Sequence, residues 1–186
     1  MRTETRVEEK KKIKIKKPEG YFCFACGTAN PIGLNLEFYA SSDRVLTEIT
    51  LNRYHAGWHD IAHGGIISTI LDEVMSWTVL YFKRCFFVTR RLDIKYVKPV
   101  KTGVPLVAGG RILACSDNGQ AVSVSGELRD NHNALLAKAK AEFIIIPRED
   151  IQPGFKDSEK EIFSLIDELE KTEEKGNRKE ERGKRK

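Results

Sequence analysis

The sequence predicts a single α+β domain in which an antiparallel sheet curls around one long helix. The chain has 186 residues and is 40% hydrophobic, which suffices for one domain of about 130 residues with tails. A long apolar run begins at Gly64, and four β-rich runs separated by turn-forming residues follow it. One helix followed by consecutive strands joined by short turns is typical of α+β proteins.

The individual elements follow from hydrophobic periodicity and turn composition. The first two strands flank a turn at residues 41–43, and a loop over residues 55–62 leads into the helix. The later breaks contain Lys-Thr-Gly, Asp-Asn-Gly and Asn-His-Asn, which favour turns. The predicted strands are residues 33–39, 44–51, 86–98, 104–114, 120–129 and 135–146, and the predicted helix is residues 64–82.

A second, short amphipathic helix is expected over residues 158–171, where apolar residues recur at helical spacing. We expect it to pack on its own domain or dimer, with binding of another partner as the alternative.

Charge is concentrated at the two ends of the chain. Residues 1–17 carry a net charge of +5 and residues 171–186 a net charge of +4, so the whole-chain value of +5 leaves residues 18–170 at −4. We therefore expect a basic extension over residues 1–17, the domain over residues 18–148 and a charged extension over residues 149–186. Solvated tails explain the charge, and attachment to nucleic acid or to an anionic surface is the alternative. Neither tail interleaves aromatic residues with its charges as a single-strand binder would, so a nucleic-acid partner is not expected, and neither is a membrane.

The chain shows no targeting or membrane signal in its sequence. No apolar run approaches the roughly 18 residues of a membrane span, and no apolar segment follows the N-terminal lysines. A cytoplasmic protein with reduced cysteines is therefore expected.

Cys23 and Cys26 form a close pair whose nearest further metal ligands are His55 and His59, but this spacing fits no common zinc site. We expect a turn that caps the sheet, and no metal.

The start of the long helix has the composition of an oxyanion-binding site. Gly64 and Gly65 carry no Cβ, so the first N–H groups of the helix are open to an incoming carbonyl at the positive end of the helix dipole. Further along, Asp72 lies on the polar arc of the helix between the small residues Ser68 and Ser76. Small neighbours leave room for a ligand or for another chain.

The spacing of these groups predicts a site between two subunits. Gly64 and Asp72 are eight residues apart, which is roughly 12 Å along a helix axis. An amide donor and a water-activating base should both lie within roughly 6 Å of the same carbonyl carbon. If both groups act, two antiparallel copies of the helix must supply them, as in a homodimer.

These residues, together with several others, resemble the hotdog-fold acyl-CoA thioesterases of the PaaI type, within the thioesterase superfamily. The resemblance covers roughly residues 21–147. It is carried by Cys-Phe-Ala-Cys-Gly at residues 23–27, Asn-Pro-Ile-Gly-Leu at residues 30–34, His-Gly-Gly at residues 63–65, and Thr-Arg-Arg-Leu-Asp-Ile-Lys-Tyr at residues 89–96. The pattern also includes Pro99, Gly103 and Asp72, which lies nine residues beyond His63.

The resemblance implies a hotdog fold and a role for four residues. The N–H of Gly64 would bind the thioester oxygen, Asp72 would be the general base or nucleophile, and Thr89 would hold the attacking water. His63 would orient the turn and help to polarise the carbonyl. Relatives commonly have an Asn, a Gln or a Pro-Gly pair just upstream, where this chain reads His-Ala-Gly-Trp-His-Asp at residues 55–60.

We therefore expect a homodimer, or a tetramer built from two dimers, that hydrolyses an acyl-CoA or related thioester without a metal or redox cofactor. Coenzyme A enters as part of the substrate. Further contacts to the substrate are expected from the residues Gly65, Glu73, Arg90 and Arg91. An acyl-CoA-binding or regulatory domain without turnover is one alternative function, and a hotdog hydratase or dehydratase is another.

Each assignment has a structural alternative. Asp72 could be a carboxylate bonded across a dimer interface, Glu73 a salt-bridge partner and His63 a turn residue. Thr89 could be an ordinary strand residue, and a solvated strand face explains Arg90 and Arg91 as well as contacts to coenzyme A phosphates.

Overall fold

The structure, a computed structural model, describes residues 12–151 and residue 164. Apart from Ser164, the predicted helix at residues 158–171 lies outside the described residues. The strands are β1 (Ile13–Ile15), β2 (Phe38–Ser41), β3 (Arg44–Thr50), β4 (Ala56–Trp58), β5 (Ile61–Ala62), β6 (Phe87–Tyr96), β7 (Pro105–Cys115), β8 (Ala121–Asp130) and β9 (Leu135–Ile145). The helices are α1 (Gly64–Lys83) and the short 3-10 turns η1 (Arg53–His55) and η2 (Arg148–Asp150).

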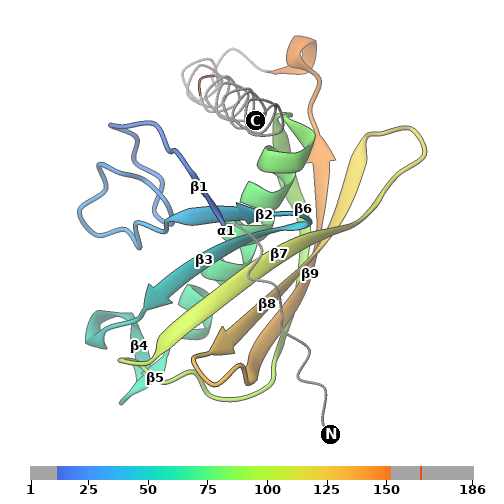
Figure 1. The fold of residues 1–186 in the computed structure, drawn as a ribbon. Helices are drawn as coiled ribbons and strands as arrows, with labels where there is room; N and C mark the ends of the chain where they lie inside the picture. The colour runs from blue at the N-terminus through green and yellow to red at the C-terminus, as the bar shows by residue number, and fades with distance from the viewer. Residues whose placement is uncertain (1–11, 152–163, 165–186) are drawn as a thin grey trace, which may run out of the picture.

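Within the described residues, seven strands form one antiparallel sheet in the order β1-β2-β3-β7-β8-β9-β6. The sheet curls around α1, and β4 pairs with β5 in a separate hairpin beside the start of the helix (Figure 1). The α+β class and the wrapping of a sheet around one long helix are thus confirmed.

The core lies between α1 and the concave face of the sheet. Along β8 the buried positions alternate with partly exposed ones, as expected for a sheet with one face covered. The helix contributes residues with no exposed surface at Ile70, Leu71, Val74 and Met75. α1 is long and apolar enough to cross a membrane by length and composition, but the sheet already covers its apolar face.

Close approach between α1 and β7 fixes the height of the helix above the sheet. A Cβ atom at Gly110 would lie 2.3 Å from Oγ1 of Thr78 and 2.9 Å from the carbonyl oxygen of Val74. Only glycine fits this crossing without a shift of the helix.

We expect Gly110→Ala to lower the free energy of unfolding by about 1–3 kcal/mol, the usual cost of overpacking a core. Gly109→Ala is the matched control, because its Cβ would come within 2.9 Å of the flexible end of Leu46 but stay 3.8 Å from the nearest backbone atom, the carbonyl oxygen of Val45. Urea denaturation of the two variants measures the difference, and equal losses would contradict the assigned contact.

The N-terminal boundary of the sheet differs from the prediction. Ile13–Ile15, placed in the basic extension by its composition, pairs with β2 as the outermost strand, and Ile15 is buried. The predicted strand at residues 33–39 begins only at Phe38, because Leu34 and Leu36 donate their backbone N–H groups to the carbonyls of Phe24 and Ala25. These bonds hold the Cys23–Gly27 turn against the domain.

Candidate functional site

His63 caps the start of α1. Its Nδ1 accepts the N–H of Gly65 at 2.9 Å, and its carbonyl accepts the N–H groups of Ile66 and Ile67. A neutral imidazole that accepts through Nδ1 carries its proton on Nε2, which leaves one donor for a ligand. The side chain of His63 is thus engaged in an ordinary capping bond, and its role toward a substrate stays a prediction.

The two glycine amides differ in what they can bind. The N–H of Gly65 is already taken by His63, which differs from the prediction that both amides are open. The N–H of Gly64 has no hydrogen-bond partner among the residues that the structure describes. Gly64 is therefore the amide that is left for an incoming oxyanion, at the positive end of the α1 dipole.

Tyr96, at the end of β6, lies against the same helix start. Its hydroxyl donates to the carbonyl of Gly64 at 3.1 Å and lies 2.8 Å from Oγ of Ser68, which itself bonds the Gly64 carbonyl. Tyr96 was not among the predicted site residues. The available signal was its alternation with Leu92 and Ile94, which places it on the strand face toward the helix.

Two turns further along α1, the carboxyl of Asp72 meets the hydroxyl of Thr89. Oγ1 of Thr89 donates to Oδ1 of Asp72 at 3.2 Å. Burial raises the pKa of Asp72 above its ordinary value, and the hydrogen bond from Thr89 offsets part of this effect. A carboxylate with a raised pKa is a better proton acceptor than an ordinary surface aspartate.

A β-bulge points Thr89 at the helix. Strict alternation from Leu92 and Ile94 would put Thr89 on the outer face of the sheet, together with Arg91. The pairing of β6 with β9 shifts register between Thr89 and Arg91, so Arg90 is the extra residue. The bulge moves Thr89 to the inner face, and bulges of this kind recur next to active sites.

The predicted substrate contacts lie elsewhere in the protomer. Arg90 pairs with Glu142 of β9, and Arg91 pairs with Asp93 at 2.8 Å; both arginines are largely exposed on the outer side of the sheet. Their role toward a substrate stays a prediction.

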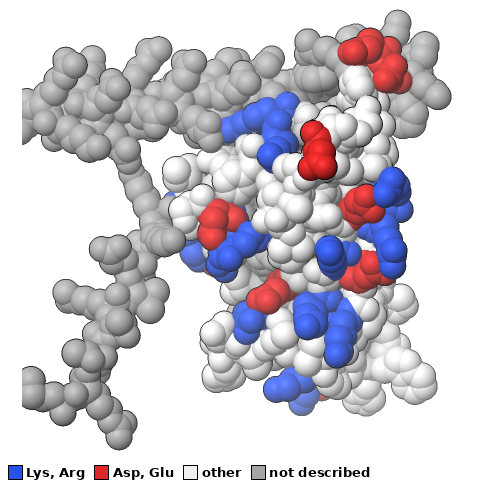
Figure 2. Space-filling view, turned by 90° about the vertical axis from the view of Figure 1, so that its right-hand side faces the viewer, with Lys and Arg blue, Asp and Glu red and all other residues white. Residues whose placement is uncertain are grey.

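The side of the molecule seen in Figure 2 interleaves Lys and Arg with Asp and Glu, without the large basic area that a nucleic-acid surface would need.

Glu73 faces a different environment from Asp72. Its Oε1 accepts the indole N–H of Trp77 at 3.0 Å and lies 3.9 Å from Sγ of Cys23. Burial, followed by the charge of Cys23, raises the pKa of Glu73 to about 7. Within one protomer, the side chain of Glu73 contacts the N-terminal turn and Trp77.

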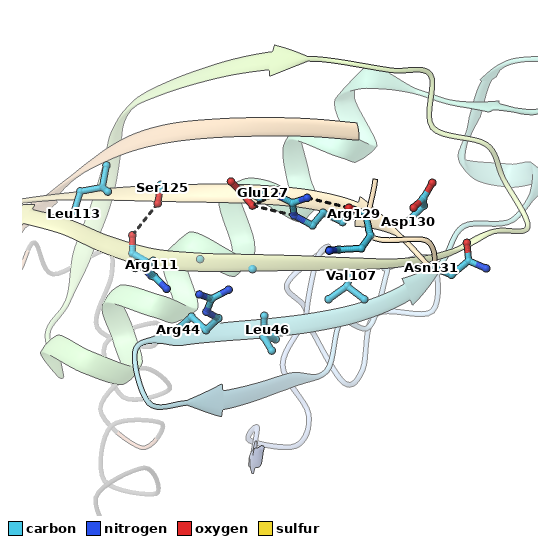
Figure 3. A pocket seen from close by; sticks show the side chains of 13 residues that line it. Arg44, Leu46, Val107, Arg111, Leu113, Ser125, Glu127, Arg129, Asp130 and Asn131 are labelled. Carbon is cyan, nitrogen blue, oxygen red and sulfur yellow. Dashed lines mark hydrogen bonds and ion pairs between the residues drawn. The ribbon is translucent and has the colours of Figure 1, made fainter. Parts of the chain in front are cut away.

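A hollow of about 610 Å³ lies on the outer face of β3, β7 and β8, away from α1 (Figure 3). Its arginines are paired with acids: Arg129 with Glu127 at 2.8 Å, and Arg111 with Asp43 at 2.6 Å. None of the predicted site residues lines it. The surface beside Asp72 is accessible to solvent, since Thr89 is exposed and Tyr96 is 52% exposed.

Part of the chain is similar to a known protein family. Residues 59–134 match the family model of the thioesterase superfamily, a range that contains His63, Gly64, Asp72, Thr89 and Tyr96. A search of curated protein sequences gave no match.

Solved structures share the fold. A thioesterase superfamily protein aligns with a TM-score of 0.61 and 20% identity over 66% of this chain; the chain spans 59% of that protein's length. The PaaI protein of the E. coli phenylacetic acid degradation operon aligns with a TM-score of 0.56 and 15% identity, over 61% of this chain and 81% of its own. A hypothetical thioesterase from Streptococcus pneumoniae, solved with coenzyme A, has a TM-score of 0.55 and 18% identity, over 60% of this chain and 86% of its own. The chain therefore has the hotdog fold of these structures, and residues 59–134 are similar to the thioesterase superfamily.

Proposed function

We propose that this protein is an acyl-CoA thioesterase that acts as a homodimer with each site shared between two subunits. The observation that carries the proposal is the hydrogen bond between Thr89 and the half-buried Asp72, two turns from the open amide of Gly64 on the same helix. The coenzyme A bound to the Streptococcus pneumoniae protein supports the choice of thiol. A cytoplasmic location remains part of this proposal.

The reaction requires a donor, a base and a positioned water. The thioester oxygen accepts the N–H of Gly64, and the helix dipole stabilises the negative charge that develops there. Thr89 donates to Asp72 and accepts a hydrogen bond from water, so that water lies beside the carboxylate. As the water oxygen bonds to the carbonyl carbon, its proton moves to Asp72. The C–S bond then breaks, and the thiolate leaves and takes up a proton to give free coenzyme A and the acid.

The edge of the sheet supplies a surface for the second subunit. β6 is ten residues long and pairs only with β9 among the described strands, so its other side presents unpaired backbone groups. Apolar side chains are exposed on and just after it: Val88 is 47% and Val97 is 42% exposed.

Pairing of β6 with its own copy about a two-fold axis would continue the sheet and place the two α1 helices side by side in opposite directions. Gly64 of the partner subunit would then approach Asp72. The amide and the carboxylate could then reach the same carbonyl carbon, although they are separated by roughly 12 Å along one helix.

The direct test is a panel of acyl-CoA esters of different chain length and aromaticity, with detection of the released thiol, on the full chain. We expect hydrolysis of at least one class and a dimer in sedimentation velocity. Tight binding of esters without thiol release would favour the binding-domain alternative instead. Loss of the conjugated absorbance of an enoyl-CoA without thiol release would favour a hydratase.

Thr89→Val should remove the hydroxyl while keeping a β-branched side chain. The bond from Thr89 lowers the pKa of Asp72, so its loss raises that pKa and leaves less carboxylate at a given pH. Activity requires the carboxylate and is lost as pH falls, so the acid limb of the kcat/KM profile should move to higher pH. We also expect kcat to fall about 10- to 100-fold, the scale of a hydrogen bond to a charged group. Thr89→Ser is the control, and an unshifted acid limb in Thr89→Val would count against the assigned role.

A further inference from the structure

The N-terminal turn and α1 bring three metal-ligand atoms together at a place that the thioesterase chemistry does not use. Sγ of Cys23, Sγ of Cys26 and a carboxylate oxygen of Glu73 all lie within 4.8 Å of one another, and the Cys23–Glu73 pair is at 3.9 Å. In a tetrahedral zinc site, sulfur ligands lie about 3.8 Å apart and a sulfur and an oxygen ligand about 3.5 Å apart. We propose that Cys23, Cys26 and Glu73 form a site for a divalent cation of the zinc class.

The turn is built to present the two sulfurs on one side. The N–H of Gly27 donates to the carbonyl of Cys23 at 2.9 Å, and a Cβ at Gly27 would lie 2.5 Å from that carbonyl oxygen. Cysteines bind metals as thiolates, and the turn keeps both sulfurs within reach of one ion.

Groups behind the ligands hold them in place. The indole N–H of Trp77 donates to Oε1 of Glu73 at 3.0 Å and lies 3.4 Å from Sγ of Cys26. The hydroxyl of Tyr21 donates to the Cys26 carbonyl at 2.9 Å and lies 3.0 Å from its sulfur. Outer partners of this kind orient the ligands of metal sites and are a normal part of their structure.

The donor set suits a divalent cation. Cys26 and Trp77 are each 3% exposed, so the Cys26 thiol stays protonated while no ion is bound, and the charge of two thiolates and a carboxylate is tolerated there only beside a cation that displaces the proton. A divalent cation neutralises most of that charge, and two sulfurs with one oxygen suit a borderline-soft ion such as Zn²⁺. Cys23 and Glu73 are only partly buried, which leaves a path for the ion and a fourth position for water.

The histidines expected as the nearest further ligands do not join this cluster. Nδ1 of His55 accepts the N–H of Asn52 as part of the η1 cap, and His59 is exposed with a positive φ of 47°. The third ligand comes from Glu73, 50 residues beyond Cys23, so the site ties the N-terminal turn to the helix position next to Asp72.

The test measures metal on the full, untagged chain purified with a reductant, loaded with Zn²⁺ and freed of excess ion by gel filtration. We expect about one zinc per chain, and with Co²⁺ in place of zinc a thiolate-to-metal charge-transfer band. Glu73→Gln and Cys26→Ser should weaken binding by more than about 100-fold, and Trp77→Phe by about 10- to 100-fold. Cys115→Ser, which removes an exposed thiol elsewhere, is the matched control and should bind like the wild type.

Several results would overturn the site. Wild-type protein without stoichiometric zinc would do so, as would a Co²⁺ complex without a thiolate band, or a Cys23–Cys26 disulfide that persists under the reductant. The Co²⁺ spectrum of the wild type stands even if a ligand variant fails to fold. Because none of these readouts is enzymatic, their outcome is separate from that of the proposed thioesterase activity.

Discussion

Asp72→Asn is expected to lower kcat for thioester hydrolysis at least about 100-fold, the scale of losing general-base assistance. Asparagine has nearly the same shape and can still accept the hydrogen bond of Thr89, but it cannot take a proton from water. The dimer should persist, because the change keeps the size of a half-buried side chain. Thiol release on the best ester of the panel and sedimentation velocity together measure the two outcomes.

Asp93→Asn is the matched control for Asp72→Asn. Asp93 is an exposed aspartate of β6 that pairs with Arg91 on the outer face of the sheet, so its replacement should leave kcat close to the wild-type value. In the wild type, burial raises the pKa of Asp72, so kcat/KM should fall as pH drops through that pKa. Turnover by Asp72→Asn equal to that of Asp93→Asn would remove Asp72 from the mechanism.

Gly64→Pro is expected to lower kcat by about 10²- to 10³-fold, the usual loss for one oxyanion donor. Proline removes the one N–H that the proposal uses, and it is well tolerated at the first position of a helix. The preceding residue, His63, has φ −63° and ψ 136°, a conformation that a following proline allows. Gly64→Ala keeps the N–H, and its Cβ would meet Tyr96 only at 3.4 Å, so it should lose much less activity. Equal kcat values for the proline and alanine variants would exclude this amide as the donor.

Mixing the two inactive variants tests whether the site is shared. In a dimer of one Asp72→Asn and one Gly64→Pro subunit, one of the two sites would combine the intact Gly64 with the intact Asp72. Random exchange of equal amounts should therefore restore about one quarter of the wild-type activity, because half of the dimers are mixed and each has one good site. A site within a single protomer would recover no activity on mixing.

Local sequence patterns predicted the central helix and the two candidate functional groups on it, the amide of Gly64 and the carboxylate of Asp72. The helix was expected over residues 64–82 and occupies Gly64–Lys83, because His-Gly-Gly can cap it and the apolar spacing of its face is strongly helical. The strand pairings of β7, β8 and β9 likewise followed from alternation and turn composition. The helix depends on interactions within a few residues of the chain, and these strand pairings join neighbouring strands through short turns.

Other features depend on pairing between distant segments. Thr89 reaches Asp72 only because β6 and β9 pair with a bulge at Arg90, and alternation within β6 alone would have turned Thr89 outward. The hydrogen bond from the Gly65 N–H to His63 is local, but it depends on the orientation of the His63 side chain, which residue types do not specify. Ile13–Ile15 has the composition of a basic tail but pairs with β2, since an edge strand needs only backbone groups and one buried side chain.

The sequence by itself determined the α+β class, the glycine start of the central helix, and the eight-residue distance between Gly64 and Asp72, because helical rise and hydrophobic period are local properties. Only the tertiary structure decided which partners those groups meet. Tyr96 lies beside Gly64, Thr89 beside Asp72 and Glu73 beside Cys23. These contacts join residues 17 to 50 positions apart, and the curl and register of the sheet, rather than any spacing in the chain, set their distances.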